Sequence, residues 1–180
     1  IEPASVARTA HEVVERCRHI HATYRQPALV EEFIDGAELN QALYHGPNGL
    51  VLLPPGEVCF APDLEPHERI VGWKAKWDAG SREDLATANR TPARISDSLR
   101  AEIGRLCSDA VRLLGITGYC RFDLRCPPAS SPIGPDSSPA YIVDVNPNPD
   151  IGAGTGFRKA LEAAGIPLQQ FLNELIIAAT

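Results

Sequence analysis

The stretch Tyr141-Ile-Val-Asp-Val-Asn-Pro-Asn-Pro-Asp150 is an apolar run that carries Asp144 and Asn146 and stops at two prolines. Its pattern predicts a β-strand, in which alternate side chains point to the same face, so Asp144 and Asn146 lie side by side. Two neighbouring oxygen donors at the end of a strand suit a hard cation such as Mg2+. For this stretch alone, a strand end that closes in an Asx turn before Pro147 is an equally good interpretation.

A second strand-like stretch, Gly118-Tyr-Cys-Arg-Phe-Asp-Leu-Arg125, places Arg121 and Asp123 on one face in the same way. If this strand pairs with the first, three oxygen donors and one guanidinium converge on one patch. That combination favours a site for phosphate and a divalent metal. The alternative is that Asp123 forms a simple ion pair with Arg121 or Arg125.

The rest of the chain alternates helical patterns with short strands. Asp35-Gly36 and Pro54-Pro-Gly56 predict tight turns, so that consecutive strands run back along each other. The sequence therefore predicts an α+β fold, a mostly antiparallel sheet flanked by helices, and not a doubly wound parallel sheet. We expect helices at 9–24, 97–114, 157–164 and 167–178, strands at 28–34, 37–44, 50–53, 57–61, 118–125 and 141–146, and a Pro/Ser-rich hairpin connection at 127–139.

Residues 63–92 show no clear periodicity. A long irregular stretch in a compact domain is usually a functional lid or a disordered segment. Within it, Trp73-Lys-Ala-Lys-Trp77 places Lys76 beside two tryptophans. Taken alone, Lys76 fits a solvated lysine as well as a phosphate ligand, and the tryptophans fit side chains that pin the stretch to the domain.

Composition excludes several classes of protein. The 180 residues are 44% hydrophobic and 22% charged, with a net charge of −6, which is typical of a globular protein without a basic nucleic-acid-binding patch. We expect no membrane partner, because no apolar run reaches about 18 residues. The five cysteines form no CxxC pair and predict reduced, mostly buried thiols in a cytoplasmic protein. Because the chain begins at Ile1 and contains no methionine, we expect it to be a piece of a longer protein.

Four segments, in this order, resemble the C-terminal lobe of ATP-grasp enzymes, and most closely that of D-alanine–D-alanine ligase. They are Leu29-Val-Glu-Glu-Phe-Ile-Asp-Gly-Ala-Glu38, Trp73-Lys-Ala-Lys-Trp77, Gly118-Tyr-Cys-Arg-Phe-Asp123 and Tyr141-Ile-Val-Asp-Val-Asn-Pro-Asn-Pro149. The resemblance covers nearly the whole chain from about residue 28. It implies that residues 1–27 are a helix carried over from the central ATP-grasp lobe, and that residues 28–180 form the C-terminal nucleotide- and metal-binding domain.

The resemblance also implies a nucleotide site. Glu31 would accept a hydrogen bond from the adenine amino group, and Phe33 and Ile34 would offer backbone atoms to the ring. Glu38 would hold the ribose hydroxyls. Lys76, on the irregular stretch, would approach the phosphates of ATP.

The remaining roles concern metal and substrate. By the resemblance, Arg121 would stabilise the charge that develops on an acyl phosphate or tetrahedral intermediate. Asp123, Asp144 and Asn146 would bind two Mg2+ ions, with Mn2+ as the alternative ion. The loop from Asp150 to Gly156 would face the carboxylate substrate through Asp150, Gly152 and Thr155, although Thr155 is an equally good helix N-cap.

The function that the resemblance implies is that of an ATP-dependent carboxylate–amine ligase working through an acyl phosphate. Its partners would be a small carboxylate, a small amine and the remaining ATP-grasp lobes, with a homodimer left open, and this piece alone would be inactive. Two departures support the alternative, a non-catalytic nucleotide-binding or regulatory module. The ligases usually carry Glu at the position of Asp144 and Gly at the position of Asp150.

Overall fold

The computed structural model describes residue 1, residues 3–127 and residues 140–179. The predicted hairpin connection at 127–139 lies outside these residues except for Pro127. The chain divides into two compact units, which are described separately. One unit comprises Ile1–Asp35 and Phe60–Ala88, and the other comprises Gly36–Cys59 and Asn89–Thr180.

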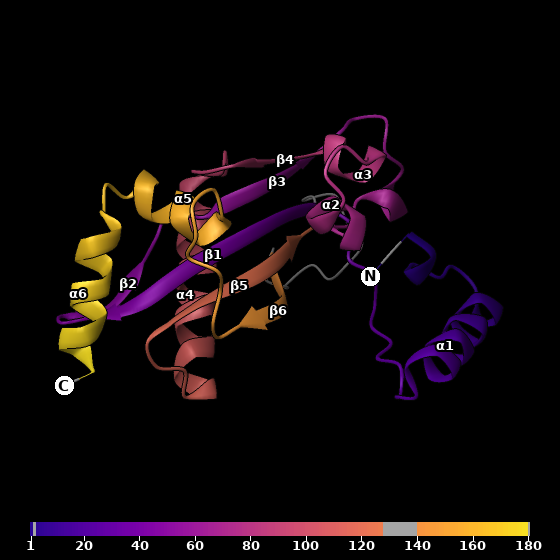
Figure 1. Cartoon of the computed structure of the whole chain (residues 1–180), viewed down its shortest axis with the longest axis horizontal. Coiled ribbons are helices and arrows are strands. Elements are labelled where there is room, and N and C mark those ends of the chain that lie inside the picture. Colours follow the sequence, from indigo (N-terminus) through magenta and orange to yellow (C-terminus); the bar gives the residue numbers. More distant parts are fainter. Residues whose placement is uncertain (2, 128–139, 180) are drawn as a thin grey trace. The chain divides into compact units, whose positions relative to one another are not determined.

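The fold is built on a six-stranded, mostly antiparallel sheet (Figure 1). The central strand is β1 (Ala37–Gly46). It pairs antiparallel with β2 and β3 along one edge and with β5 along the other, and β5 pairs antiparallel with β6. The strand order is β4-β3-β1-β5-β6, with β2 also on β1, which confirms the predicted α+β class. The strands are β1 (Ala37–Gly46), β2 (Gly49–Leu52), β3 (Gly56–Phe60), β4 (Thr87–Arg90), β5 (Tyr119–Cys126) and β6 (Tyr141–Asn146).

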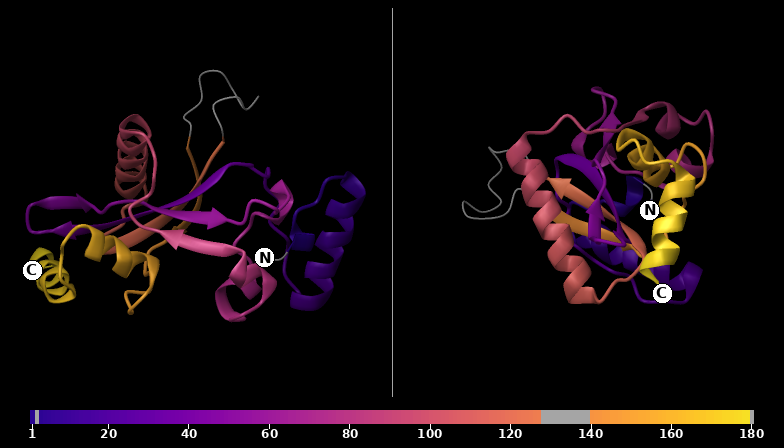
Figure 2. Two further views of the ribbon diagram at one scale, coloured as in Figure 1. Left: turned by 90° about the horizontal axis from the view of Figure 1, so that it is seen from above. Right: turned by 90° about the vertical axis from the view of Figure 1, so that its left-hand side faces the viewer.

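Helix α4 (Asp97–Leu114) covers one face of this sheet (Figure 2). Ser96 caps its N-terminus by accepting a hydrogen bond from Leu99 N, and Gly115, in the left-handed region at φ 65°, ends it as predicted. Alternate residues of β1 and β5 meet the apolar stripe of the helix. The fully buried members of this layer are Leu39, Leu43, Ile103, Cys107, Cys120, Phe122 and Leu124.

Helices α5 (Gly156–Ala163) and α6 (Leu168–Ala178) cover the opposite face at one end of the sheet (Figure 2). Ala42 and Tyr44 of β1 pack there against Phe157, Leu161 and Phe171. Tyr119 of β5 joins them through edge-on ring contacts. These helices cover the Tyr44 and Tyr119 end of the face, and polar residues occupy the strand positions beyond it.

The cysteines are free, in agreement with the prediction of reduced thiols. Three of them, Cys107, Cys120 and Cys126, are buried. Burial raises the pKa of Cys107 to about 12 and the pKa values of Cys120 and Cys126 to about 11. Because the thiolate is the reactive form, these three thiols are unreactive near neutral pH.

The smaller unit contains the N-terminal helix α1 (Ala10–Tyr24), which begins with a capping box of Thr9 and Glu12. No residue of α1 is buried. The prediction that 63–92 is irregular is wrong in part, because this stretch contains four short elements. They are the 3-10 helix η2 (Pro66–Glu68), α2 (Trp73–Trp77), α3 (Arg82–Leu85) and β4; a further 3-10 helix, η1 (Pro3–Ser5), precedes α1.

The predicted strand at 28–34, with a hairpin turn at Asp35-Gly36, is wrong. These residues form no regular element, and Leu29 is 82% exposed. A strand needs a neighbour for its backbone groups. The expected neighbour, β1, has β5 along one edge and β3 and β2 along the other, so neither edge is left for a returning hairpin.

In the part of the chain described here, no helix is long and apolar enough to span a membrane.

Candidate functional site

Arg121 and Asp123 lie on the same face of β5 and form a two-bond ion pair. Arg121 donates from Nε to Asp123 Oδ1 at 2.7 Å and from Nη2 to Oδ2 at 2.8 Å. Both side chains are about one-quarter exposed or less. The pair is therefore planar, partly desolvated and in the geometry that fixes a guanidinium most firmly. The pairing predicted as the alternative for Asp123 is thus present in the structure.

Strand β6 brings Asp144 and Asn146 to this pair. Asp144 is the cross-strand partner of Asp123, and Asn146 is the partner of Arg121. Directly opposed residues of an antiparallel pair project from the same face, with their side chains close together. The convergence that the sequence predicted, of three oxygen-bearing side chains and one guanidinium, is confirmed by this register.

A register shift makes that convergence possible. Asp123 pairs with Asp144, but the next residue of β5, Leu124, pairs with Ile142, so Val143 is left over as a bulge. Ile142 and Val145 both pack into the layer beneath α4. Without the bulge, Asp144 would share the face of Ile142 instead of the face of Asp123.

The turn interpretation of the same stretch is also correct. Asn146 Oδ1 accepts a hydrogen bond from the backbone N of Asn148 at 3.0 Å, which is an Asx turn around Pro147. Tyr119 then donates its hydroxyl to Asn148 Oδ1 at 2.5 Å. Asn146 therefore holds the turn and stands in the polar cluster at once, because its carboxamide oxygen carries two lone pairs.

Arg121, Asp123, Asp144 and Asn146 lie on one face of the sheet, which we call the polar face. Glu38 of β1 extends it on the side of β5 away from β6. It pairs across the strands with Arg125, and Arg125 Nη2 lies 2.7 Å from Glu38 Oε2. Their side chains are only 14% and 8% exposed, and Arg125 Nη1 also donates to Gly36 O at 3.3 Å. Glu38, the predicted ribose ligand, is therefore held by the buried Arg125, which the sequence predicted only as an alternative partner for Asp123.

The loop before α5 is organised by its own side chains. Asp150 Oδ1 accepts a hydrogen bond from Gly152 N at 2.7 Å. Thr155 accepts from Arg158 N at 3.4 Å as the N-cap of α5, and its hydroxyl lies 2.9 Å from both Asp150 O and Gly152 O. The capping role predicted for Thr155 is confirmed. A contact of Asp150, Gly152 or Thr155 with substrate stays a prediction.

Sequence reasoning missed Asn40, which lies on β1 directly opposite Asp123. It stands on the same face as Glu38, two residues away, and alternation along the predicted strand at 37–44 could have indicated it. A Cβ added at Gly56, its partner on β3, would lie 2.7 Å from Asn40 Oδ1. A side chain at position 56 would therefore displace the Asn40 carboxamide.

The predicted adenine and phosphate ligands lie in the smaller unit. Glu31 is exposed, Phe33 and Ile34 are half-buried, and none of them belongs to a helix or strand. Lys76 is exposed on α2, and the neighbouring Trp73 and Trp77 rings are 62% and 72% exposed. Their assignment to a nucleotide site stays a prediction.

The polar face fits a hard metal ion by its chemistry. Asp123, Asp144 and Asn146 offer only oxygen donors, which suits Mg2+ better than Zn2+. Among the described residues there is no group of three or more His, Cys, Asp and Glu placed to hold a metal. The assignment of Asp123, Asp144 and Asn146 as metal ligands stays a prediction. Each Asp123 oxygen already accepts one bond from Arg121 and has a second lone pair for a metal.

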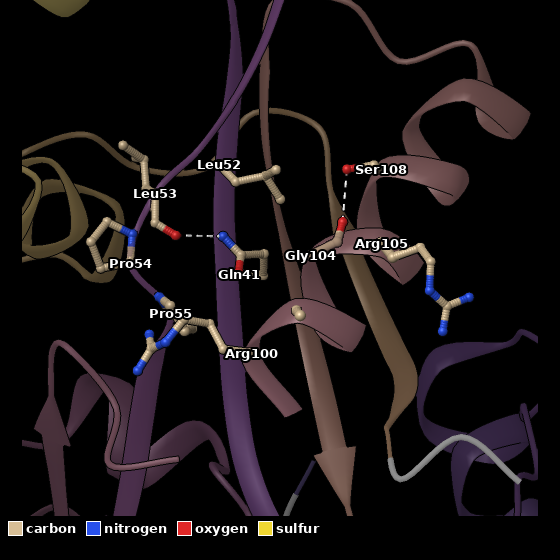
Figure 3. A pocket seen from close by; sticks show the side chains of 10 residues that line it. Gln41, Leu52, Leu53, Pro54, Pro55, Arg100, Gly104, Arg105 and Ser108 are labelled. Carbon is tan, nitrogen blue, oxygen red and sulfur yellow. Dashed lines mark hydrogen bonds between the residues drawn. The ribbon is translucent and has the colours of Figure 1, made fainter. Parts of the chain in front are cut away.

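A cavity of about 560 Å3 lies on the other face of the sheet, between β1, β2 and α4 (Figure 3). Gln41 lies at its centre and donates from Nε2 to Leu53 O at 2.7 Å. Leu52, Pro54 and Pro55 form an apolar wall, and Arg100, Gly104, Arg105 and Ser108 of α4 stand opposite. The cavity contains none of the predicted site residues.

Comparison with known proteins gives one family. The family model described as D-ala D-ala ligase C-terminus matches residues 5–177. The D-alanine–D-alanine ligase of Azobacteroides pseudotrichonymphae is 30% identical over 148 residues, which are 82% of this chain and 40% of that ligase. The corresponding ligase of Gloeobacter violaceus is 28% identical over 173 residues, 96% of this chain and 49% of that ligase. The chain spans less than half the length of these curated relatives.

Solved structures show the same fold. The D-alanine–D-alanine ligase of Bacillus anthracis complexed with ATP matches with a TM-score of 0.69 and 15% identity over 96% of this chain and 47% of that one. The VanG D-Ala:D-Ser ligase of Enterococcus faecalis matches with a TM-score of 0.60 and 18% identity over 83% of this chain and 38% of that one. Together with the family match, these likenesses confirm the predicted fold, that of an ATP-grasp C-terminal lobe.

Proposed function

The chain belongs to the D-ala D-ala ligase C-terminus family, and we propose that it supplies the nucleotide- and metal-binding part of an ATP-dependent carboxylate–amine ligase. The observation that carries this proposal is the bidentate Arg121–Asp123 pair directly opposite Asn146 and Asp144. A fixed guanidinium next to oxygen donors is what phosphoryl transfer from ATP requires.

In the proposed reaction, a substrate carboxylate oxygen attacks the γ-phosphorus of ATP, and ADP leaves with the electrons of the broken P–O bond. An amine nitrogen then attacks the carbonyl carbon of the acyl phosphate. The C–O bond to phosphate breaks, inorganic phosphate leaves, and the amine loses a proton as the amide forms. Arg121 would offset the negative charge in both steps. Its two hydrogen bonds to Asp123 hold the guanidinium in place, so the guanidinium need not move during the reaction.

Asp123, Asp144 and Asn146 would hold two Mg2+ ions, with Mn2+ as a substitute. Such ions would neutralise part of the negative charge on the phosphates. Asp144 has a shorter side chain than the glutamate usual in these ligases, and it is exposed on the sheet face. It would therefore reach a metal ion from closer to the strand.

We propose the following roles for the residues that would bind the nucleotide. Glu31, Phe33 and Ile34 would contact adenine, Glu38 the ribose hydroxyls, and Lys76 the phosphates, with residues 1–27 as part of the central lobe. The buried Arg125 supports the ribose role, because its ion pair with Glu38 fixes the position of the carboxylate. Since ATP is the co-substrate, we place the reaction in the cytoplasm.

Asp150, Gly152 and Thr155 would face the carboxylate substrate. Asp150 brings a negative charge to this loop, where a glycine is usual in the family, and its Oδ1 is occupied by Gly152 N. This places a negative charge beside the substrate carboxylate, which a glycine at this position would not do. We therefore propose a carboxylate–amine ligase without assigning D-alanine as its substrate.

The test is Mg2+-dependent phosphate release from ATP by the full-length protein, screened over pairs of D- and L-amino acids and dipeptides. Release that depends on one carboxylate–amine pair is the expected result and identifies the substrates. Nucleotide binding without release for any pair would replace this proposal with a non-catalytic nucleotide-binding module. Residues 1–180 alone are expected to release no phosphate with the same pair, because they span less than half of the related ligases.

A further inference from the structure

We propose that Asn40 is a binding residue of the same site, and that its carboxamide and Arg121 Nη1 together hold one anionic oxygen of the ligand in the space above Gly156. This inference rests on the proposed ligase function and adds a residue and a subsite to it. The oxygen belongs either to the transferred phosphoryl group or to the substrate carboxylate, which share the same acceptor chemistry.

The first support is the position of Asn40. It faces Asp123 across β1 and β5, while Arg121, two residues from Asp123, faces Ala42, which has only a methyl group. Directly beside the guanidinium, β1 therefore presents a small side chain, and one pleat further along it presents a carboxamide. A donor in that position reaches into the polar face without covering Arg121.

The second support is the space that Gly56 leaves beside the Asn40 carboxamide. A Cβ at Gly56 would lie 2.7 Å from Asn40 Oδ1, 3.1 Å from its Nδ2 and 3.0 Å from Thr91 Oγ1. The absence of a side chain at Gly56 is therefore what gives this carboxamide its place.

The third support is an open position next to both groups. A Cβ placed on Gly156 would lie 3.8 Å from Asn40 Oδ1 and 3.9 Å from Arg121 Nη1, and those are the neighbours found within 4 Å of it in the described residues. An oxygen near this point could approach both side chains to hydrogen-bonding distance. Glycine at 156 therefore leaves a space shared by one cation and one carboxamide.

The fourth support is the bonding capacity that remains. Arg121 uses Nε and Nη2 for Asp123, and in the described residues Nη1 has no hydrogen-bond partner. The Asn40 carboxamide also has no hydrogen bond to another described residue, and a half-turn about χ2 presents its Nδ2 donor to the open position. One charged N–H donor, from the guanidinium that Asp123 pairs with, and one neutral N–H donor match an anionic oxygen.

The decisive variant is Gly156→Ala in the full-length protein. The new methyl group would meet its neighbours at ordinary contact distances of 3.8 and 3.9 Å, so the fold should be retained, but it would fill the space meant for the ligand oxygen. We expect kcat/KM to fall roughly 100-fold, as for the loss of an oxyanion donor. Gly104→Ala is the matched control. Gly104 lies on α4, its added Cβ would meet Leu52 of β2 at 3.6 Å, and the variant should leave kcat/KM unchanged.

Asn40→Asp gives an independent test, because it keeps the shape of the side chain and replaces the donor with a negative charge. We expect a comparable loss of kcat/KM, with Asn48→Asp in the exposed turn between β1 and β2 as the matched control. A rise in KM for ATP would identify the phosphoryl oxygen, and a rise confined to the KM of the carboxylate substrate would identify that carboxylate.

Unaltered kinetics in both Gly156→Ala and Asn40→Asp, with an active wild type, would overturn the inference and leave the ligase proposal intact. An inactive wild type would instead count against the ligase proposal. In that case calorimetric titration with MgATP and with inorganic phosphate decides the subsite. Affinity for either that falls about tenfold in the two variants supports it, and affinity that is unchanged for both refutes it.

Discussion

Arg121 and Asp123 are two residues apart on one strand, and the arginine donates two nearly equal hydrogen bonds to the aspartate, of 2.7 and 2.8 Å. The pair stands next to Asp144 and Asn146 of the neighbouring strand. The aspartate therefore orients the guanidinium and also belongs to the candidate metal ligands. A change at either residue should consequently affect both phosphoryl transfer and the metal requirement.

Arg121→Lys should lower kcat of the full-length enzyme by about 100-fold or more, because an ammonium cannot donate in the bidentate geometry that fixes the charge. Steady-state kinetics with saturating ATP would measure this. Arg112→Lys is a fair comparison, since Arg112 pairs with Asp109 on the exposed side of α4. A kcat for Arg121→Lys close to that of the comparison variant would remove Arg121 from the reaction.

Asp144→Asn should raise the Mg2+ concentration that gives half-maximal activity by at least tenfold, because a neutral amide binds a divalent cation more weakly than a carboxylate. The measurement is an Mg2+ titration of phosphate release at fixed ATP. Asp109→Asn applies the same substitution to an exposed residue of α4 and should not change the titration midpoint. The metal assignment fails if the two variants titrate alike.

Arg125→Met should destabilise the fold by about 3 kcal/mol, because it leaves the Glu38 carboxylate buried without its partner. Urea unfolding followed by circular dichroism would give the free energy of unfolding. The double variant Glu38→Leu/Arg125→Met removes both charges and should recover much of the loss. Additive losses in the double variant would mean that the pair is not coupled.

Tyr44 donates a hydrogen bond of 2.6 Å to Glu174 of α6, and this bond should make stability depend on pH. The hydrogen bond from Tyr44, followed by that from Gln170, lowers the pKa of Glu174 below its ordinary value of 4.5, while burial and then Glu174 raise the pKa of Tyr44 above 10. The depressed pKa of Glu174 contributes stability that is present above pH 4.5 and is lost as the pH falls further. The raised pKa of Tyr44 contributes stability that is present below pH 10 and is lost as the pH rises further.

The difference in Tm between the wild type and Tyr44→Phe should therefore be largest from about pH 5 to 9 and should shrink on both sides of that window. Thermal unfolding across pH 3 to 11 would measure it. A difference that stays constant down to pH 3 would show that Glu174 does not take part. Gln170→Ala removes only the weaker hydrogen bond to Glu174, so it should change the pH dependence of Tm at acidic pH less than Tyr44→Phe does.

Local sequence determined those elements whose signals lie within a few residues. The capping box of Thr9 and Glu12 and the interval from Ser96 to Gly115 set the ends of α1 and α4, since caps satisfy backbone groups of the same helix. Alternation placed Arg121 with Asp123, and Asp144 with Asn146, because neighbouring side chains of a strand point to opposite faces. These relations need no knowledge of distant residues.

The tertiary structure decided which strands pair and which face each side chain occupies. Residues 28–34 have the composition of a strand and form none, because both edges of β1 are taken by other strands. The bulge at Val143 puts Asp144 opposite Asp123, and Asn40 joins the site through its register with β5. Strand pairing depends on hydrogen bonds between segments far apart in the chain, so the sequence by itself determined the donors of the site, and only the register of the folded sheet brought them together.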